Sequence, residues 1–114
     1  MAINKTYAVF GLGRYGIAVA RELVNSGAEV LAVDVDEYTV NAAAVEIPYC
    51  KRADVTDAEV LKQLGITNID VVIIAIASNL EASVMATMLC KEAGVKTVIA
   101  KCANEMHRKL LSKV

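Results

Sequence analysis

The sequence predicts an α/β fold in which a parallel sheet lies between two layers of helices. Strand-like and helix-like segments alternate along all 114 residues, as is typical of parallel sheets joined by crossover helices. Val30–Val33 and Val71–Ala77 are continuous apolar runs, which are expected in strands covered on both faces. Apolar residues make up 56% of the chain and aromatic residues only 4%, which indicates an aliphatic core and excludes a disordered chain.

Five short segments rich in apolar residues predict the strands. They are Thr6–Phe10, Glu29–Asp34, Pro48–Ala53, Val71–Ala77 and Thr97–Ala100. We expect right-handed crossovers between them and a single sheet with the strand order 3-2-1-4-5 and helices on both faces.

Five segments with apolar residues at helical spacing predict the helices. They are Tyr15–Ser26, Asp36–Val45, Asp57–Leu64, Asn79–Ala93 and Asn104–Lys113. Gly27 follows the first helix, at a position where a left-handed cap is favoured. Asp36 is the candidate N-cap of the second helix. Thr56, with Glu59 three residues later, predicts a capping box for the third.

A glycine-rich segment lies between the first strand and the first helix. It has the pattern G-x-G-x-x-G and consists of Gly11, Leu12, Gly13, Arg14, Tyr15 and Gly16. Gly11 permits a tight turn, Gly13 lets a pyrophosphate approach the backbone, and Gly16 allows close packing of the helix. The N–H groups at the helix start then face the phosphates. The pattern predicts a nucleotide site in a Rossmann-like three-layer sandwich, although glycines that only shape a turn are the alternative.

Asp34 closes the second strand, about 20 residues after the glycines, where an acidic residue is expected to bind the adenosine ribose. Its charge would also repel a 2′-phosphate, which favours NAD over NADP. We expect the neighbouring Val35 to lie at the same site. The alternative is that Asp34 caps the next helix, but Asp36 competes for that role and would leave Asp34 free.

Two further strand ends lie at the same edge of the expected sheet, where ligands bind in such folds. Asp54, Val55 and Thr56 follow the third strand and are expected to flank an adenine. Ala75 and Ile76 end the fourth strand, and their size would allow a ligand close to the backbone. The alternatives are helix capping for the first group and simple core packing for the second.

Two basic residues are candidates for contacts with phosphates. Arg14 lies inside the glycine segment, and a guanidinium there can bind phosphate oxygens in a fork. Lys101 follows the fifth strand at the same edge of the sheet and is expected to reach a terminal phosphate. For Arg14 the alternative is a solvated residue in the first helical turn.

The sequence offers no recognisable catalytic machinery. His107 is the only histidine and lies beside Arg108 and Lys109 in the last helix, which indicates a surface residue. No serine has a G-x-S-x-G context, and no residues remain for a substrate domain. We therefore expect a binding module and not an enzyme. The cofactor lobe of an NAD-dependent dehydrogenase and a redox-sensing repressor remain open alternatives.

Cysteine usage and hydropathy indicate a cytoplasmic protein. The spacings of Cys50, Cys90 and Cys102 match no metal or redox motif, which indicates small buried residues or idle thiols. No apolar run approaches the roughly 20 residues of a membrane-spanning helix. With 12 basic and 13 acidic residues, bulk charge does not suggest a nucleic-acid partner.

The expected helix Asn79–Ala93 carries apolar residues on more than one face. They are Leu80, Val84, Met85, Met88, Leu89 and Cys90. Such a helix in a small domain predicts a contact between subunits, so we expect at least a dimer, with Asn104–Lys113 also taking part. A helix that is simply well buried is the alternative.

Taken together, these segments resemble the N-terminal lobe of RCK domains, of the TrkA-N type. The resemblance rests on residues 8–16, 29–34, 53–56 and 72–76, on Lys101, and on the residues from His107 to Leu111. It covers essentially the whole chain, so residues 1–114 are expected to form one nucleotide-binding domain. The sequence is most similar to the regulatory subunits of Ktr and Trk potassium-uptake systems, the Ktr type in particular.

The resemblance implies a cytosolic regulatory subunit that binds ATP, ADP or NAD(H). It implies that the identity of the nucleotide switches the conformation of the subunit and so gates a membrane potassium transporter or channel. It implies a homo-oligomer, with a ring of such lobes that docks on a membrane potassium-translocating subunit at the inner face of the membrane. The three glycines, Asp34, the loop from Asp54 to Thr56 and Lys101 match its nucleotide-contacting positions, and Arg14 matches the position associated with ATP phosphates. The sequence departs from the family by ending at Val114 without the usual C-terminal lobe.

Overall fold

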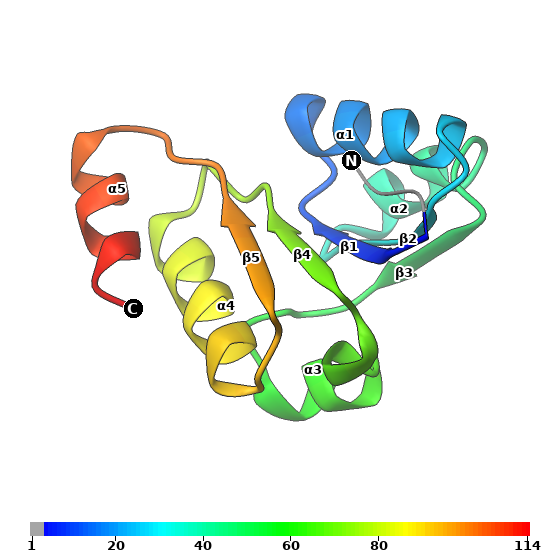
Figure 1. The fold of residues 1–114 in the computed structure, drawn as a ribbon. Coiled ribbons are helices and arrows are strands. Elements are labelled where there is room, and N and C mark those ends of the chain that lie inside the picture. The colour runs from blue at the N-terminus through cyan, green and yellow to red at the C-terminus, as the bar shows by residue number, and fades with distance from the viewer. Residues whose placement is uncertain (1–3) are drawn as a thin grey trace.

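The computed structural model describes residues 4–114, so the first three residues of the expected domain lie outside it. Five parallel strands form one sheet in the order β3-β2-β1-β4-β5, which confirms the predicted topology (Figure 1). The strands are β1 (Thr6–Phe10), β2 (Glu29–Asp34), β3 (Tyr49–Arg52), β4 (Val71–Ile74) and β5 (Thr97–Ala100). The helices are α1 (Arg14–Asn25), α2 (Glu37–Ala43), α3 (Ala58–Gln63), α4 (Leu80–Glu92) and α5 (Glu105–Ser112), with a 3₁₀ turn η1 at Ile66–Asn68.

The core has two halves because successive side chains of a strand point to opposite faces of the sheet. From β1, Tyr7 and Val9 pack under α1 and α2, beside Ala20 and Leu23 of α1. The alternate residues Ala8 and Phe10 pack on the other face against the side of the molecule that carries α3 and α4. The three-layer α/β sandwich predicted from the sequence is therefore confirmed.

Two details near the sheet edge differ from the prediction. Strand β4 ends at Ile74 instead of Ala77, although the Ala75 N–H still donates to the Phe10 carbonyl at 2.7 Å. The capping box at Thr56 is wrong, because Asp57 is the N-cap of α3 and its side chain accepts from the Glu59 N–H at 2.9 Å. The Thr56 hydroxyl instead donates to Asp54.

The prediction that His107 is a surface residue is also wrong. Helix α5 lies against α4 (Figure 1), and the His107 side chain is only 1% exposed. Its Nδ1 accepts from the Ala103 N–H at 3.0 Å, which requires the ring proton to be on Nε2. Nε2 lies 2.8 Å from the hydroxyl oxygen of Ser83, a buried residue of α4. The ring therefore ties α5 to α4.

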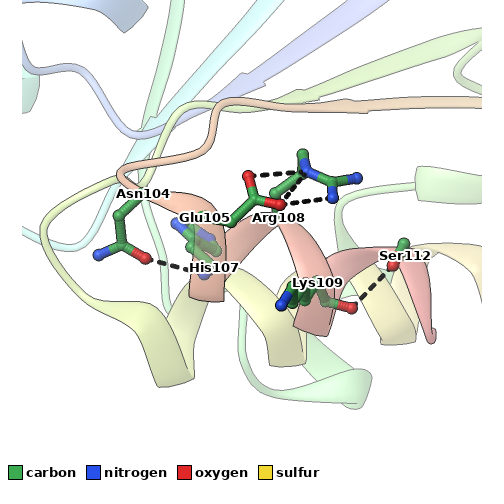
Figure 2. A network of polar contacts seen from close by, with 6 residues as sticks. All are labelled: Asn104, Glu105, His107, Arg108, Lys109 and Ser112. Carbon is green, nitrogen blue, oxygen red and sulfur yellow. Dashed lines mark hydrogen bonds and ion pairs between the residues drawn. The ribbon is translucent and has the colours of Figure 1, made fainter.

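The solvent side of α5 carries the charged residues that surround His107 in the sequence. Figure 2 shows Asn104 capping the helix through the His107 N–H and Arg108 paired with Glu105. Met106 and Leu110 are 62% and 39% exposed, whereas His107 is buried, so α5 turns the histidine and not these two apolar side chains to the interior.

The three cysteines differ in burial. Cys90 lies in the core, where burial raises the pKa of its thiol to about 12, so the group stays protonated at neutral pH. Cys50 is half-buried and Cys102 is exposed. No helix between residues 4 and 114 combines the length and the apolar character that a membrane crossing requires.

Candidate functional site

A cleft of about 710 Å³ opens at the carboxyl ends of the strands. It brings together most of the candidate residues identified from the sequence. Those in its wall are Gly11, Leu12, Gly13, Asp34, Val35, Asp54, Val55, Thr56, Ala75 and Ile76. Gly16 lies beneath the glycine loop, and Arg14, Tyr15 and Lys101 lie outside the wall. The structure therefore assembles the predicted site from four strand ends that are distant in sequence.

The three glycines of the loop have different roles. Gly11 has φ +96°, and a Cβ at Gly16 would lie 1.7 Å from the Gly11 carbonyl oxygen, so both are required by the turn and by its contact with α1. A Cβ at Gly13, in contrast, would meet no atom within 4 Å apart from those of its chain neighbours. Gly13 has an ordinary backbone conformation and lines the cleft. Packing within the fold therefore does not require a glycine at this position.

Helix α1 begins at this loop with unsatisfied backbone donors. Its N-cap is Gly13, which has no side chain to accept a hydrogen bond, and its first turn holds no acidic residue. Within residues 4–114, the N–H groups of Arg14, Tyr15 and Gly16 have no hydrogen-bond acceptor. Free N–H groups and the helix dipole make such a start suitable for an anion.

Asp34, at the end of β2, holds the glycine loop in place through hydrogen bonds. Its Oδ2 accepts from the Leu12 N–H at 2.8 Å, and its Oδ1 accepts from the Asp36 N–H at 2.9 Å. Asp36 caps α2 as predicted, but Asp34 is not left free, because it holds two backbone donors. A carboxylate has about four acceptor positions. Asp34 therefore retains capacity for the hydroxyl groups of a ligand while it fixes the loop.

The loop after β3 is held by an internal contact. Asp54 Oδ1 accepts from both the N–H and the hydroxyl group of Thr56, and these bonds keep the pKa of Asp54 below its ordinary value. Val55 between them is buried. Neither Asp54 nor Thr56 caps α3, whose N-cap is Asp57, so the capping alternative does not account for them.

Comparison with known proteins identifies the family. The family model of the TrkA-N domain matches residues 7–114. The chain belongs to this family. It is 44% identical over 112 residues to the Ktr system potassium uptake protein C of Bacillus subtilis, a match of 98% of the chain to 51% of that protein. The Ktr system potassium uptake proteins A of Bacillus subtilis and Vibrio alginolyticus are 42% and 41% identical over 111 residues, each matching 97% of the chain to 50% of the relative.

This TrkA-N domain thus spans about half the length of these curated relatives, and the resemblance to Ktr proteins is confirmed. Among solved structures, it is similar to the TrkA-N domain of the inner membrane protein ybaL from Escherichia coli, with a TM-score of 0.84 at 12% identity, covering 99% of this chain and 84% of that one. It is also similar to the NAD(P)-binding domain of an exopolyphosphatase-related protein from Archaeoglobus fulgidus, with a TM-score of 0.83 at 21% identity, covering 96% and 82%. These likenesses show the fold.

Part of the cleft of this TrkA-N domain was not expected from the sequence. It is formed by the start of α4 and by one residue of α2, namely Ser78, Asn79, Glu81, Ala82, Met85 and Thr39. Met85 was assigned to a subunit contact from its apolar character, but it lines the cleft. The available signal was Asn79, which caps α4 through the Ala82 N–H at 3.0 Å and so fixes the helix start beside the strand ends.

The two basic candidates of this TrkA-N domain, Arg14 and Lys101, lie outside the wall of the cleft. Arg14 is exposed and forms no ion pair within the described residues. Lys101 is anchored by its N–H, which donates to the Ile74 carbonyl at 2.9 Å. Its ammonium lies 5.0 Å from the centre of the Tyr15 ring. The structure therefore brings Lys101 to Tyr15, and none of Arg14, Tyr15 and Lys101 lines the cleft.

Proposed function

We propose that the cleft binds an adenine nucleotide, either ATP and ADP or NAD(H), and that the chain is the nucleotide-binding domain of a regulatory subunit for potassium uptake. The observation that carries this proposal is the start of α1, where Gly13 lines the cleft and the N–H groups that follow it have no acceptor within residues 4–114. Such a start favours a phosphate group. The proposal covers residues 1–114 as one domain that binds and does not turn over its ligand.

The charges along the edge of the sheet support one orientation of the nucleotide. Asp34 ends β2 and Asp54 follows β3, on one side of the glycine loop, and Lys101 follows β5 on the other. Carboxylates suit the hydroxyl groups of a ribose and repel phosphates, whereas cations attract phosphates. We therefore orient the adenosine toward Asp34, Val35 and the loop after β3, and the terminal phosphates toward Arg14 and Lys101.

The test of the site is a calorimetric titration with ATP, ADP, NAD, NADH and NADP. Ligands with a free ribose 2′-hydroxyl should bind, and NADP should bind more weakly because Asp34 repels its 2′-phosphate. Asp34→Asn should weaken NADH by about tenfold, since a hydrogen bond to a charged group contributes about 1.5–3 kcal/mol, and should reduce the discrimination against NADP. Asp57→Asn, at the start of α3, is the control. No binding of any adenine nucleotide would contradict the proposal.

We propose that the exchange of ATP and ADP switches the conformation of the protein and that Arg14 distinguishes the two nucleotides. The glycine loop has backbone donors for two phosphates, and a third requires another cation. Arg14→Ala should keep ADP binding and weaken ATP binding, with a difference of about 1–3 kcal/mol that is typical of allosteric coupling. It should also abolish ATP-dependent potassium flux when the protein is reconstituted with a Ktr-type membrane subunit. Equal loss of both nucleotides would show that Arg14 only contributes to binding.

We also propose that the protein acts at the inner face of the membrane, bound to a potassium-translocating subunit, as a homo-oligomer formed through α4 and α5. The relatives are named as potassium uptake proteins, and Leu80, Met106 and Leu110 expose apolar surface on these two packed helices. Met106→Glu combined with Leu110→Lys should give a smaller species in sedimentation. Val45→Glu is the matched control, because Val45 is 86% exposed and follows α2 on the far side of the molecule (Figure 1). An unchanged sedimentation coefficient for the double variant would contradict this interface.

A further inference from the structure

Tyr15 and Lys101 meet across the end of β4. Tyr15 is in the first turn of α1, which follows β1, and Lys101 follows β5. Strand β4 lies between these two strands, and the hydrogen bond from the Lys101 N–H to Ile74 fixes the lysine backbone against it. The side chain then brings its ammonium to 5.0 Å from the Tyr15 ring centre, a distance at which the ring attracts a cation.

Lys101 is held differently from two of the arginines. Arg21 is paired with Glu46 at 2.9 Å, and Arg108 with Glu105 at 2.6 Å, so a carboxylate neutralises each of them. Within residues 4–114, Lys101 has no carboxylate partner. The face of an aromatic ring attracts the charge but offers no conventional acceptor atom, so the three ammonium donors remain available.

We infer that Tyr15 is a positioning residue, whose ring holds the Lys101 ammonium beside the open start of α1 so that it meets the terminal phosphates of a bound nucleotide. This inference rests on the proposed nucleotide site. Tyr15 lies outside the wall of the cleft and therefore acts through Lys101. The flexible lysine stem would otherwise lose conformational freedom each time a nucleotide bound. The ring reduces that loss because the charge is already in place.

The experiment compares Tyr15→Phe with Tyr15→Leu by calorimetric titration of ATP and ADP. Phenylalanine keeps the ring and should bind like the wild type. Leucine removes the ring and should weaken ATP about two- to fivefold, the range expected from an exposed cation–π contact, with a smaller effect on ADP. In a Lys101→Met background, which has no ammonium, Tyr15→Leu should have no further effect.

A second measurement does not depend on nucleotide binding. The ε-methylene protons of Lys101 should show upfield NMR shifts from the ring in the ligand-free wild type and in Tyr15→Phe, but not in Tyr15→Leu. Absence of these shifts in the wild type would overturn the inference. An equal effect of Tyr15→Leu with and without Lys101 would also overturn it, because the ring would then act on the nucleotide directly or on the fold. If the wild type shows the shifts but binds no nucleotide, the proposed function fails and the phosphate-positioning role fails with it.

Discussion

Two helices begin at the same cleft, and their first turns are built differently. Helix α1 starts at Gly13 with no side-chain cap and no acidic residue. Helix α4 starts at Asn79, whose side chain accepts from the Ala82 N–H, and carries Glu81 in its first turn. Both Asn79 and Glu81 line the cleft. Helices α2, α3 and α5 follow the α4 pattern, each with an Asp or Asn cap and a Glu in the first turn.

The difference indicates where an anion can bind. A side-chain cap satisfies one of the free donors, and an acidic first turn offsets the positive end of the helix dipole. The start of α4 is therefore less favourable for phosphates, although it lies in the cleft, and Glu81 adds repulsion. Among the α-helices of residues 4–114, only α1 starts without a side-chain cap and without an acidic residue in its first turn. A polyphosphate in this cleft should lie over α1 and avoid α4.

The largest expected effects distinguish Gly16, which the fold requires, from Gly13, which lines the cleft at the start of α1. Gly16→Ala should cost about 3 kcal/mol or more of stability, because its Cβ would overlap the Gly11 carbonyl and backbone would have to move. Gly13→Ala should cost at most about 1 kcal/mol, the difference between good and poor N-cap residues, yet weaken ATP binding tenfold or more. Urea denaturation and calorimetry measure the two effects. If Gly13→Ala bound ATP with wild-type affinity, ATP would not need the space that the missing side chain of Gly13 leaves.

The next effect concerns the contact between Ser83 of α4 and His107 of α5, and its contribution to the stability of the protein. Ser83→Ala should destabilise the protein by about 1–3 kcal/mol, because the Nε2–H of His107 is then buried without an acceptor. Ser83→Thr keeps the hydroxyl group and serves as the comparison variant. Urea denaturation should show the loss in Ser83→Ala. A stability equal to that of the wild type would mean that this contact does not anchor α5 to α4.

How far the sequence predicts this molecule depends on whether a signal is local. The G-x-G-x-x-G spacing and the cap at Asp36 act within a few residues, and both occur where they were predicted. The burial of His107 depends on Ser83, which lies on another helix. Its charged neighbours in sequence describe the opposite face of α5 and led to the wrong prediction.

The residues of the cleft also divide into those that the sequence predicts and those that depend on contacts between distant elements. Strand ends that meet at one edge follow from the parallel topology, so Asp34 and the loop from Asp54 to Thr56 could be grouped in advance. The contribution of α4 could not, because the apolar character of Met85 is equally compatible with core, interface and cleft. The sequence likewise did not show which of the adjacent residues Asp54, Thr56 and Asp57 caps α3, because each has a side chain that can accept a backbone hydrogen bond. In the structure Asp54 accepts from Thr56 and Asp57 accepts from Glu59.

A smaller effect is expected when the first turn of α4 loses its acidic residue and so becomes more similar to the first turn of α1. Glu81→Gln removes a charge from the cleft wall and should strengthen ATP binding about two- to fivefold at low salt, since a charge near a helix terminus contributes about 0.3–1 kcal/mol. Glu92→Gln, at the other end of α4, should have no such effect. Calorimetry at low and high ionic strength measures both variants. Equal ATP affinity in the wild type and Glu81→Gln at low salt would contradict the repulsive role of Glu81.

The smallest effect tests the capped start of α2 in the ligand-free protein. Asp36 accepts from the Thr39 hydroxyl group at 2.7 Å and from its N–H at 2.9 Å, and these bonds hold the pKa of Asp36 below its ordinary value. A lowered pKa in the folded state means that the charged form stabilises the fold. This contribution is complete above the unfolded pKa of about 3.9 and is lost as the pH falls through the lowered folded value.

Asp36→Asn keeps an acceptor but does not titrate. On acidification from neutral pH to about pH 3, the wild type should therefore lose slightly more thermal stability than the variant. The other carboxylates titrate in both proteins and cancel in the difference. Melting curves that change in parallel with pH would show that the cap of α2 gains nothing from its charge, and the contrast with α1 would then rest on hydrogen bonding alone.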